Sequence, residues 1–252
     1  MSTELQDDLG TPVELLAAPL RLVSLVPSLT EAIAATRRDL LVGATDWCSQ
    51  PPDLDVVRVS GTKNPDLAAI QTLTPDLVIT NREENRQPDV QRLRAAGVPV
   101  WVTSFDALDE AFASLHRLFE EVLQLGTPDW LTQAQRVWAP APTLELDAAL
   151  PIWRDPWMVV AGGTFSNDLL ARVGVRNVFA GLDRYPQVTL TEIQNRAPLV
   201  ILPDEPYAFG PDDGPECFTR SVLIDGRATA WYGPSLVWAR HHLEKRLAPC
   251  SH

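Results

Sequence analysis

Aromatic and polar side chains that could bind a large solute follow several apolar runs of the chain. Trp47, Asn81 and Arg82 each come shortly after such a run, and Ser28 follows another. In open parallel sheets a ligand meets residues at the carboxyl ends of the strands, so these positions are the first candidates for a binding site. Rings with a polar edge suit a large flat ligand. The alternative for Trp47 is packing within its own loop beside Cys48.

A second group of candidates lies in residues 152–158, which read IWRDPWM. Arg154 could hold a carboxylate or a propionate, because a guanidinium pairs with such groups in bidentate fashion. The alternative is a structural pair between Arg154 and Asp155. Trp157 opens a predicted strand that leads to Gly162 and Gly163. The acidic loop after Leu202, Asp-Glu-Pro-Tyr, is a further candidate at a strand end.

The chain lacks the motifs of common catalytic and nucleotide sites. No HExxH, CxxC or GxSxG occurs, and no GxGxxG follows a strand. His241 and His242 are adjacent on a predicted helix, so they point in different directions and do not easily share a metal. Ser166 is better explained as a helix cap than as a nucleophile, because no histidine accompanies it. We therefore expect a binding protein rather than an enzyme, with no catalytic residue, no metal site and no cofactor of its own.

Charge and hydropathy exclude several classes of partner. The chain carries 33 acidic and 21 basic residues, a formal net charge of −12, and has no Lys/Arg cluster. Nucleic acid is not expected, because its binding depends on basic contacts to phosphate. No run of about 18 apolar residues is present, so no membrane insertion is expected. The three cysteines are too scattered for a disulfide framework, and we expect a monomer.

The amino-terminal residues bear on localisation. The chain opens MSTELQDDLG, which is acidic, whereas a secretory signal opens with basic residues. This predicts a cytoplasmic location as written, or an extracytoplasmic one if a signal has been removed.

Alternating strands and helices position the candidates. Predicted strands lie at 21–26, 41–44, 77–80 and 98–102, and helices at 67–73 and 88–96. Ser28 and Glu31 have the spacing of a capping box that begins a helix after the first strand. From Asp106, apolar residues at three- and four-residue steps predict a helix that stops at Gly126. A second helix, 130–138, ends before Pro140.

The alternation then resumes. Strands are predicted at 157–161, 199–202 and 222–224, with a helix capped by Ser166 or Asn167 and a final helix at 235–247. This pattern predicts an α/β protein with parallel sheets in two Rossmann-like lobes. The predicted divisions are an extension at 1–19, an amino-terminal lobe at 20–105, a helical connector at 106–150 and a carboxyl-terminal lobe at 151–252.

Several blocks of sequence occur in an order typical of one protein family. The blocks are LVSLVPSLTE, LVGATDWCSQPP, LAAIQTLTPDLVIT, LRAAGVPVWV, GGTFSNDLLARVGVRNVFA, YPQVTLTEI and APLVILPDEP. Over about residues 20–245 the chain thereby resembles the class III, helical-backbone substrate-binding proteins of cobalamin and iron-siderophore ABC importers, most closely the vitamin B12-binding ones. The resemblance implies two lobes joined by a backbone helix, with the ligand held in the cleft between them.

The resemblance also implies roles for aromatic residues. Trp47 stands where the B12-binding relatives place an aromatic that contacts cobalamin. Trp231 and Tyr232 fall where the family places a cleft aromatic of the second lobe, with core packing as the alternative. Asn81 replaces the family's tryptophan in the first lobe.

Acidic residues of the family dock to arginines of the permease. Glu192 fits that position in the second lobe, while Gln87 stands at the matching position of the first lobe with Glu83 and Glu84 nearby. The resemblance therefore implies a solute-binding protein for a cobalamin-like, haem-like or ferric-siderophore ligand, delivered to an ABC importer. The alternatives are a cytoplasmic tetrapyrrole or metal-complex binding protein or enzyme on the same fold, and a ligand-free interaction protein.

Overall fold

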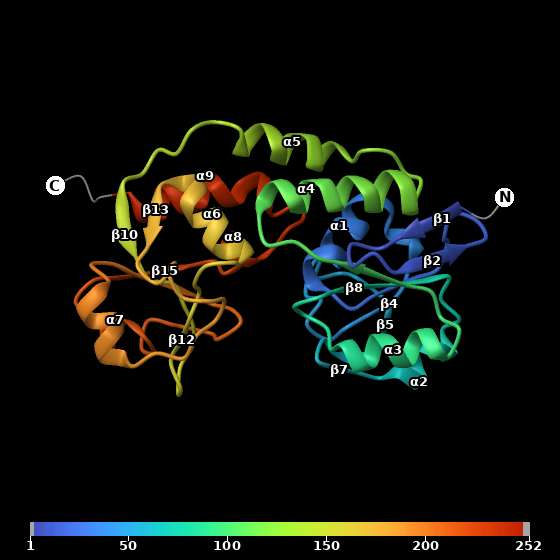
Figure 1. Cartoon of the computed structure of the whole chain (residues 1–252), viewed down its shortest axis with the longest axis horizontal. Helices are drawn as coiled ribbons and strands as arrows, with labels where there is room; N and C mark the ends of the chain where they lie inside the picture. Colours follow the sequence, from blue (N-terminus) through green and yellow to red (C-terminus); the bar gives the residue numbers. More distant parts are fainter. Residues whose placement is uncertain (1–2, 249–252) are drawn as a thin grey trace. The chain divides into compact units, whose positions relative to one another are not determined.

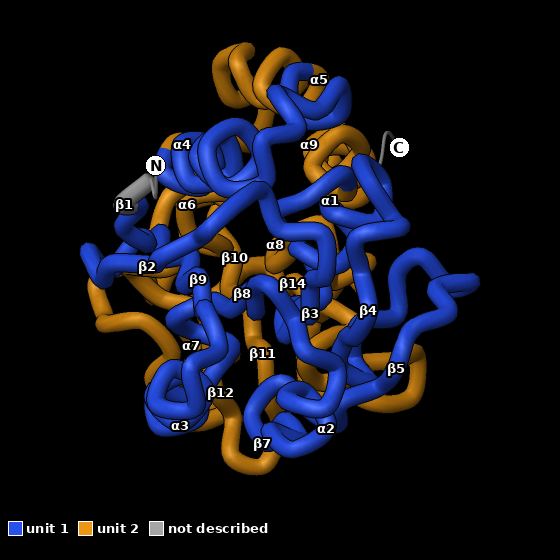
Figure 2. Tube along the Cα trace, turned by 90° about the vertical axis from the view of Figure 1, so that its right-hand side faces the viewer, with its two compact units in different colours: residues 1–105, 110–132, 232–234 blue, residues 106–109, 133–231, 235–252 orange. Residues whose placement is uncertain are grey.

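The chain forms two compact units in the computed structural model, which describes residues 3–248 (Figure 2). Unit 1 consists of Met1–Phe105, Glu110–Thr132 and Tyr232–Pro234. Unit 2 consists of Asp106–Asp109, Gln133–Trp231 and Ser235–His252. The helical segment predicted as a connector is thus divided between the units, and three residues near the carboxyl terminus belong to unit 1. Of the three cysteines, Cys250 lies outside the described residues.

A five-stranded parallel sheet forms the centre of unit 1. Its order is β5-β4-β3-β8-β9, and every neighbouring pair is parallel. The strands are β3 (Leu22–Ser24), β4 (Leu41–Ala44), β5 (Val57–Arg58), β8 (Leu77–Asn81) and β9 (Val100–Thr103). All five residues of β8 are buried, because a central parallel strand is covered on both faces. The predicted runs at 21–26, 41–44, 77–80 and 98–102 therefore contain strands.

Helices cover the two faces of this sheet. Helix α1 (Pro27–Arg37) lies on one side, and α2 (Leu67–Thr72) and α3 (Gln87–Ala95) lie on the other (Figure 1). A short 3-10 turn, η1 (Arg38–Leu40), follows α1. The capping box predicted from Ser28 was wrong: Pro27 occupies the first turn, Val26 is the N-cap, and no side chain caps the helix. Pro fits there because its missing N–H is one that the helix leaves unpaired anyway.

The segment predicted as an amino-terminal extension forms a hairpin within unit 1. Its antiparallel strands are β1 (Thr3–Gln6) and β2 (Pro12–Leu15). Two acidic residues of the turn anchor it: Asp7 accepts from Arg94 at 2.6 Å, and Asp8 accepts from Arg117 at 2.7 Å. A second small hairpin consists of β6 (Ser60–Gly61) and β7 (Asn64–Pro65).

The helical stretch after unit 1's sheet is interrupted. Helix α4 (Leu108–His116) continues as a π-helical segment, η2 (Arg117–Val122), and α5 (Asp129–Trp138) follows. The helix predicted to end at Gly126 thus ends at Val122. Within residues 3–248 no helix has the length and apolar character needed to cross a bilayer.

Unit 2 contains pairs of strands instead of one broad sheet. Strand β10 (Leu146–Ala148) pairs with β13 (Val175–Asn177), and β14 (Val200–Pro203) pairs with β15 (Ser221–Ile224), both in parallel. One parallel bridge, Ala149 to Val200, links these systems. The predicted strand 157–161 is shorter, because β12 (Met158–Val159) forms an antiparallel hairpin with β11 (Pro151–Trp153).

The helices of unit 2 follow these strands. They are α6 (Phe165–Val173), α7 (Leu190–Arg196), the 3-10 turn η3 (Pro215–Cys217), α8 (Arg227–Ala230) and α9 (Leu236–Leu247). The cap predicted for α6 was wrong: Thr164, not Ser166 or Asn167, accepts the Asn167 N–H. A buried apolar cluster that includes Trp157, Phe179 and Phe209 forms the core around β14. The α/β class with parallel pairing is thus found in both units.

Candidate functional site

An exposed tryptophan lies in the loop after β4 of unit 1. Trp47 is 69% exposed, whereas its neighbour Cys48 is fully buried. The Cys48 sulfur lies 3.0 Å from the Thr30 hydroxyl and 3.1 Å from that of Thr45. Burial raises the pKa of the Cys48 thiol, so this group is an inert anchor. The contacts of buried Cys48 therefore fix the loop, while the ring of Trp47 is exposed to solvent.

The loop after β8 is held by amide side chains. Asn81 is buried, and its Nδ2 donates to the Thr103 hydroxyl at 3.1 Å while its Oδ1 accepts from the Glu83 N–H at 2.8 Å. Both polar groups of the Asn81 side chain thus form hydrogen bonds within unit 1. The next residue, Arg82, is exposed.

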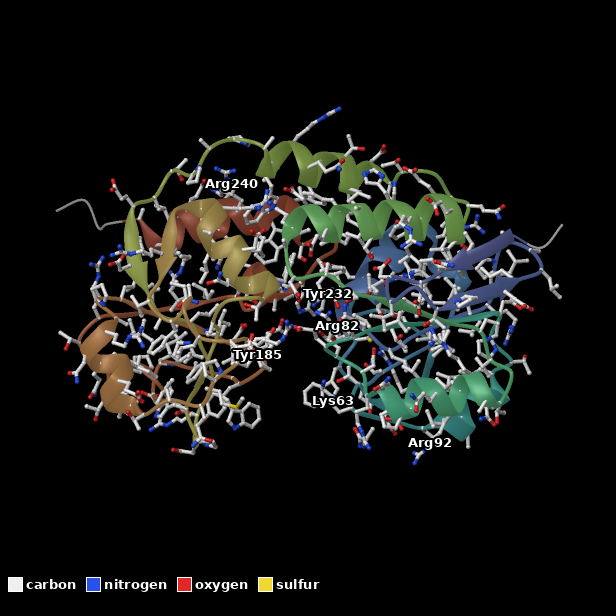
Figure 3. All side chains as sticks on the ribbon, viewed as in Figure 1. Lys63, Arg82, Arg92, Tyr185, Tyr232 and Arg240 are labelled. Carbon is white, nitrogen blue, oxygen red and sulfur yellow. The ribbon has the colours of Figure 1, made fainter. Side chains whose placement is uncertain are left out.

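Tyr232, from the segment Tyr232–Pro234 of unit 1, packs beside the loop that follows β8. The Tyr232 hydroxyl donates to Glu84 Oε1 at 2.5 Å, and the Tyr232 ring packs edge-on against Phe105 at 4.6 Å. Lys63, from the β6–β7 turn, donates to the main-chain oxygen of Glu83. Lys63, Arg82 and Tyr232 lie along one side of unit 1, while Arg92 of α3 points away below (Figure 3). Of the two acidic residues predicted for docking here, Glu84 therefore anchors a tyrosine.

Ser28 lies beneath the segment that contains Tyr232. Its side chain is buried and its hydroxyl has no hydrogen-bond partner. A Cβ on Gly233 would lie 2.7 Å from the Ser28 carbonyl oxygen, so only glycine allows this approach.

In unit 2, Trp157 belongs to an aromatic cluster. It is 7% exposed, stacks on Phe209 with centroids 5.9 Å apart, and meets Phe218 edge-on at 5.5 Å. Tyr207 continues the cluster against Phe209 at 4.6 Å. The structure places Trp157 in the core of unit 2.

Acidic residues surround Arg154. It pairs with Glu216 at 2.6 Å and with Asp213, and its guanidinium lies 5.6 Å from the Trp157 ring centre. The Arg154 guanidinium holds the pKa of Glu216 at about 2, well below its usual value. Asp155, the predicted structural partner, is more distant at 3.8 Å. The charge of Arg154 is thus already compensated from the 213–216 turn.

Trp231 is buried beside an acidic residue. Its ring lies near Glu205, and the Arg227 guanidinium lies 5.9 Å from the ring centre. Burial raises the pKa of Glu205 to about 7, and the charges of Asp204 and Asp225 act in the same direction. Trp231 therefore packs within unit 2.

Glu192 is the exposed docking candidate of unit 2. It forms a complete capping box with Thr189, whose N–H donates to its carboxylate at 2.7 Å. These hydrogen bonds from Thr189 lower the pKa of Glu192, so it is a fixed, ionised carboxylate on the surface.

Sequence reasoning missed several groups at these edges. Lys63 and Asn85 gave no signal because the two-residue strands around Lys63 have no recognisable pattern, and Asn85 was hidden in a charged loop. Within residues 3–248, no group of three or more His, Cys, Asp or Glu side chains could hold a metal ion. Nor does a described histidine follow a strand: His116 is in α4, and His241 and His242 are in α9.

Comparisons with solved structures define the fold class. The periplasmic vitamin B12-binding protein BtuF of Vibrio cholerae matches with a TM-score of 0.72 and 18% identity, over 91% of this chain and 97% of that one. The periplasmic haem-binding protein RhuT from Roseiflexus sp. RS-1 matches with a TM-score of 0.74 and 20% identity, over 90% and 97%. The chain has the class III substrate-binding protein fold, as predicted.

Comparison of sequences finds similarity to proteins named as vitamin B12-binding. The chain is 29% identical over 197 residues to the vitamin B12-binding protein of Photorhabdus laumondii, covering 75% of this chain and 72% of the relative. It is 28% identical over 203 residues to the vitamin B12-binding protein of Vibrio cholerae, covering 76% and 74%. No known family profile matches the chain. The resemblance inferred from the sequence blocks is confirmed, and these relatives support a solute-binding role for the chain.

Proposed function

We propose that the chain binds a cobalamin-like corrinoid and delivers it to an ABC importer. The observation that carries the proposal is the exposed ring of Trp47 at the carboxyl edge of unit 1's sheet, on a loop whose base is fixed by buried Cys48. Burial of that ring against a flat ligand would be favourable by about 1.5–3 kcal/mol. The named B12-binding relatives at 28–29% identity support the same ligand class.

Nearby polar groups suit the rim of a corrinoid. Lys63 and Arg82 lie on the same side of unit 1 (Figure 3) and carry N–H donors for the amide oxygens that surround a corrin. Haem and ferric siderophores are the competing ligands, and relatives of the fold are named as haem-binding proteins. The Nε2 of His242 lies at the end of β15 and already accepts from the Asp225 N–H at 3.3 Å, which leaves this nitrogen less available to a haem iron and favours a corrinoid.

The test is a direct titration. Native protein would be examined by mass spectrometry for co-purifying ligands, then titrated with hydroxocobalamin, haemin and a ferric catecholate, with absorbance and tryptophan fluorescence as readouts. We expect saturable binding of hydroxocobalamin at one site. Binding of haemin alone, or of the ferric catecholate alone, would overturn the corrinoid assignment, and binding of none would favour the ligand-free scaffold.

Delivery to a permease involves Glu192 in this proposal. Its carboxylate is exposed and ionised, which suits a pair with an arginine of a partner. Glu192→Gln keeps a capping-box residue but removes the charge. We expect unchanged corrinoid affinity and reduced uptake through the importer; unchanged uptake would remove Glu192 from the docking surface.

A further inference from the structure

One buried asparagine joins three separate loops at the edge of unit 1 that contains Trp47. The Asn85 side chain is 7% exposed. Its Nδ2 donates to the Leu25 carbonyl at 3.1 Å and to the Thr62 carbonyl at 3.0 Å, and its Oδ1 accepts from the Asn81 N–H at 2.8 Å. The main chains of Asn81 and Asn85 are also joined, at 3.0 Å, which closes the loop on itself.

These partners come from elements far apart in the sequence. Leu25 directly follows β3, Thr62 is in the β6–β7 turn, and Asn81 is the last residue of β8. Leu25 is 60 residues from Asn85, and Thr62 is 23 residues away. The side chain of Asn85 therefore fixes the relative positions of three strand ends.

The candidate ligand groups of unit 1 lie next to these three attachment points. Lys63 follows Thr62, Arg82 follows Asn81, and the β6–β7 turn lies beside the Trp47 loop, since the N–H of Asp46 donates to the Ser60 carbonyl at 2.9 Å. A Cβ on Gly61 would come within 3.5 Å of Trp47 Nε1, so the turn and the ring are neighbours. A shift of the turn would therefore move both Lys63 and the surface beside Trp47.

We propose that Asn85 is a positioning residue: its three side-chain hydrogen bonds hold the Lys63 and Arg82 loops, and through the β6–β7 turn the surface beside Trp47, in the arrangement that binds the ligand, without touching the ligand itself. This inference rests on the proposed function of unit 1's edge. Its chemistry requires an amide, because one atom must accept from an N–H while the other donates to two carbonyls. A carboxylate of the same shape would keep the acceptor and place its second oxygen against two carbonyl oxygens.

The test compares Asn85→Asp with a chemically matched variant in unit 2. Asn177 is also buried; its Oδ1 accepts from the Phe179 N–H at 3.0 Å and its Nδ2 donates to the Val160 carbonyl and to Asn167 Oδ1, both at 2.9 Å. Asn177→Asp therefore makes the same atomic change and adds the same charge. A second control, Asp76→Ala, removes two loop contacts at the opposite, amino edge of unit 1's sheet.

The first readout needs no ligand. Hydrogen–deuterium exchange should show faster exchange for Asn85→Asp at residues 59–66 and 81–86, with little change at 146–177. Asn177→Asp should show the reverse pattern. Unchanged exchange at 59–66 in Asn85→Asp would overturn the positioning role whatever the ligand is.

The second readout is affinity for hydroxocobalamin. Loss of two donor contacts should weaken binding by about 10- to 100-fold in Asn85→Asp, while Asp76→Ala, at comparable thermal stability, should stay within about threefold. Equal losses in both variants would reduce Asn85 to a general stabilising residue. If exchange changes as expected while the parent protein binds no hydroxocobalamin, the proposed ligand fails and the role of Asn85 in holding the loops stands.

Discussion

Trp47, in the loop that follows β4 of unit 1, is 69% exposed, whereas Trp157, immediately before β12 of unit 2, is 7% exposed. The polar residues beside them differ as well. In unit 1 the amides of Asn81 and Asn85 form hydrogen bonds within and between loops, and the ring of Trp47 lies at the surface. In unit 2, Asp213 and Glu216 neutralise Arg154 and the aromatic rings pack on one another.

Residue type at a strand end therefore does not decide the role of a residue. A tryptophan ring can meet a ligand only if the rest of its unit leaves that ring exposed. In the proposed function the exposed ring of Trp47 in unit 1 would contact the ligand. The aromatic residues near β12 pack in the core of unit 2 and stabilise it. Variants can test each half of the comparison.

The largest effect is expected from Trp157→Ala. Removal of a buried indole that stacks on Phe209 should lower the free energy of unfolding by about 3–5 kcal/mol. Urea denaturation followed by circular dichroism measures this. A folded variant with parental stability and weakened ligand binding would reverse the comparison and make Trp157 a ligand residue.

Trp47→Ala should weaken ligand binding and leave stability nearly unchanged, in contrast to Trp157→Ala. Stability should stay within about 0.5 kcal/mol because the ring is exposed, and hydroxocobalamin affinity should fall by about 10- to 100-fold. The matched control is Trp153→Ala, which removes the exposed tryptophan of unit 2. Equal losses in the two variants, or none in Trp47→Ala, would contradict the assignment.

A smaller effect is expected from Glu205, the buried acid beside Trp231. Its pKa is raised from 4.5 to about 7 in the folded protein, so the folded state binds its proton more tightly than the unfolded chain does. Its contribution therefore favours folding below about pH 4.5 and is lost as the pH rises through about 7. The free energy of unfolding of Glu205→Gln should consequently exceed that of the parent by about 1–2 kcal/mol at pH 8, a figure that allows for the solvent screening of a partly exposed group.

Equilibrium unfolding of both proteins at pH 5 and pH 8 checks this expectation. At pH 5 the two should be nearly equal, because the parent carboxyl group is mostly protonated there. A gap that is the same at both pH values would show that Glu205 does not titrate in this range.

The smallest effect is expected from Arg154→Met. Because Asp213 and Glu216 already hold the guanidinium, loss of Arg154 should change hydroxocobalamin affinity by less than about twofold. The hydroxocobalamin titration read by absorbance and tryptophan fluorescence measures this affinity. A tenfold loss would return Arg154 to the binding site and place part of the ligand on unit 2.

Much of unit 1's sheet could be predicted from the sequence, because short apolar runs such as residues 77–79 are typical of a strand covered on both faces. The amino-terminal hairpin could not, since Asp7 and Asp8 give it a polar composition and their partners, Arg94 and Arg117, are distant in sequence. Helix starts were mistaken for a related reason. Several Ser, Thr and Asn residues satisfy the capping spacing, and only the backbone conformation selects among them.

Some features of the candidate site could likewise be predicted from the sequence, and others could not. The exposure of Trp47 agrees with a role that its place after a strand predicted. The compensation of Arg154 could not be foreseen, because Asp213 and Glu216 are about sixty residues further along the chain. Asn85 was missed because a buried amide in a charged loop has no local pattern that separates it from a solvated one.

The segment Tyr232–Pro234 has a consequence for how the protein is made. Unit 1 is composed almost entirely of residues before Thr132, yet Tyr232 donates to Glu84 across 148 residues of sequence, and Gly233 fits against Ser28. During synthesis from the amino terminus, the sheet of unit 1 can form early, but this edge stays uncovered until most of unit 2 has left the ribosome. Limited proteolysis of released fragments measures this: a fragment that ends before Trp231 should be cut near Phe105, and the chain of 252 residues should resist.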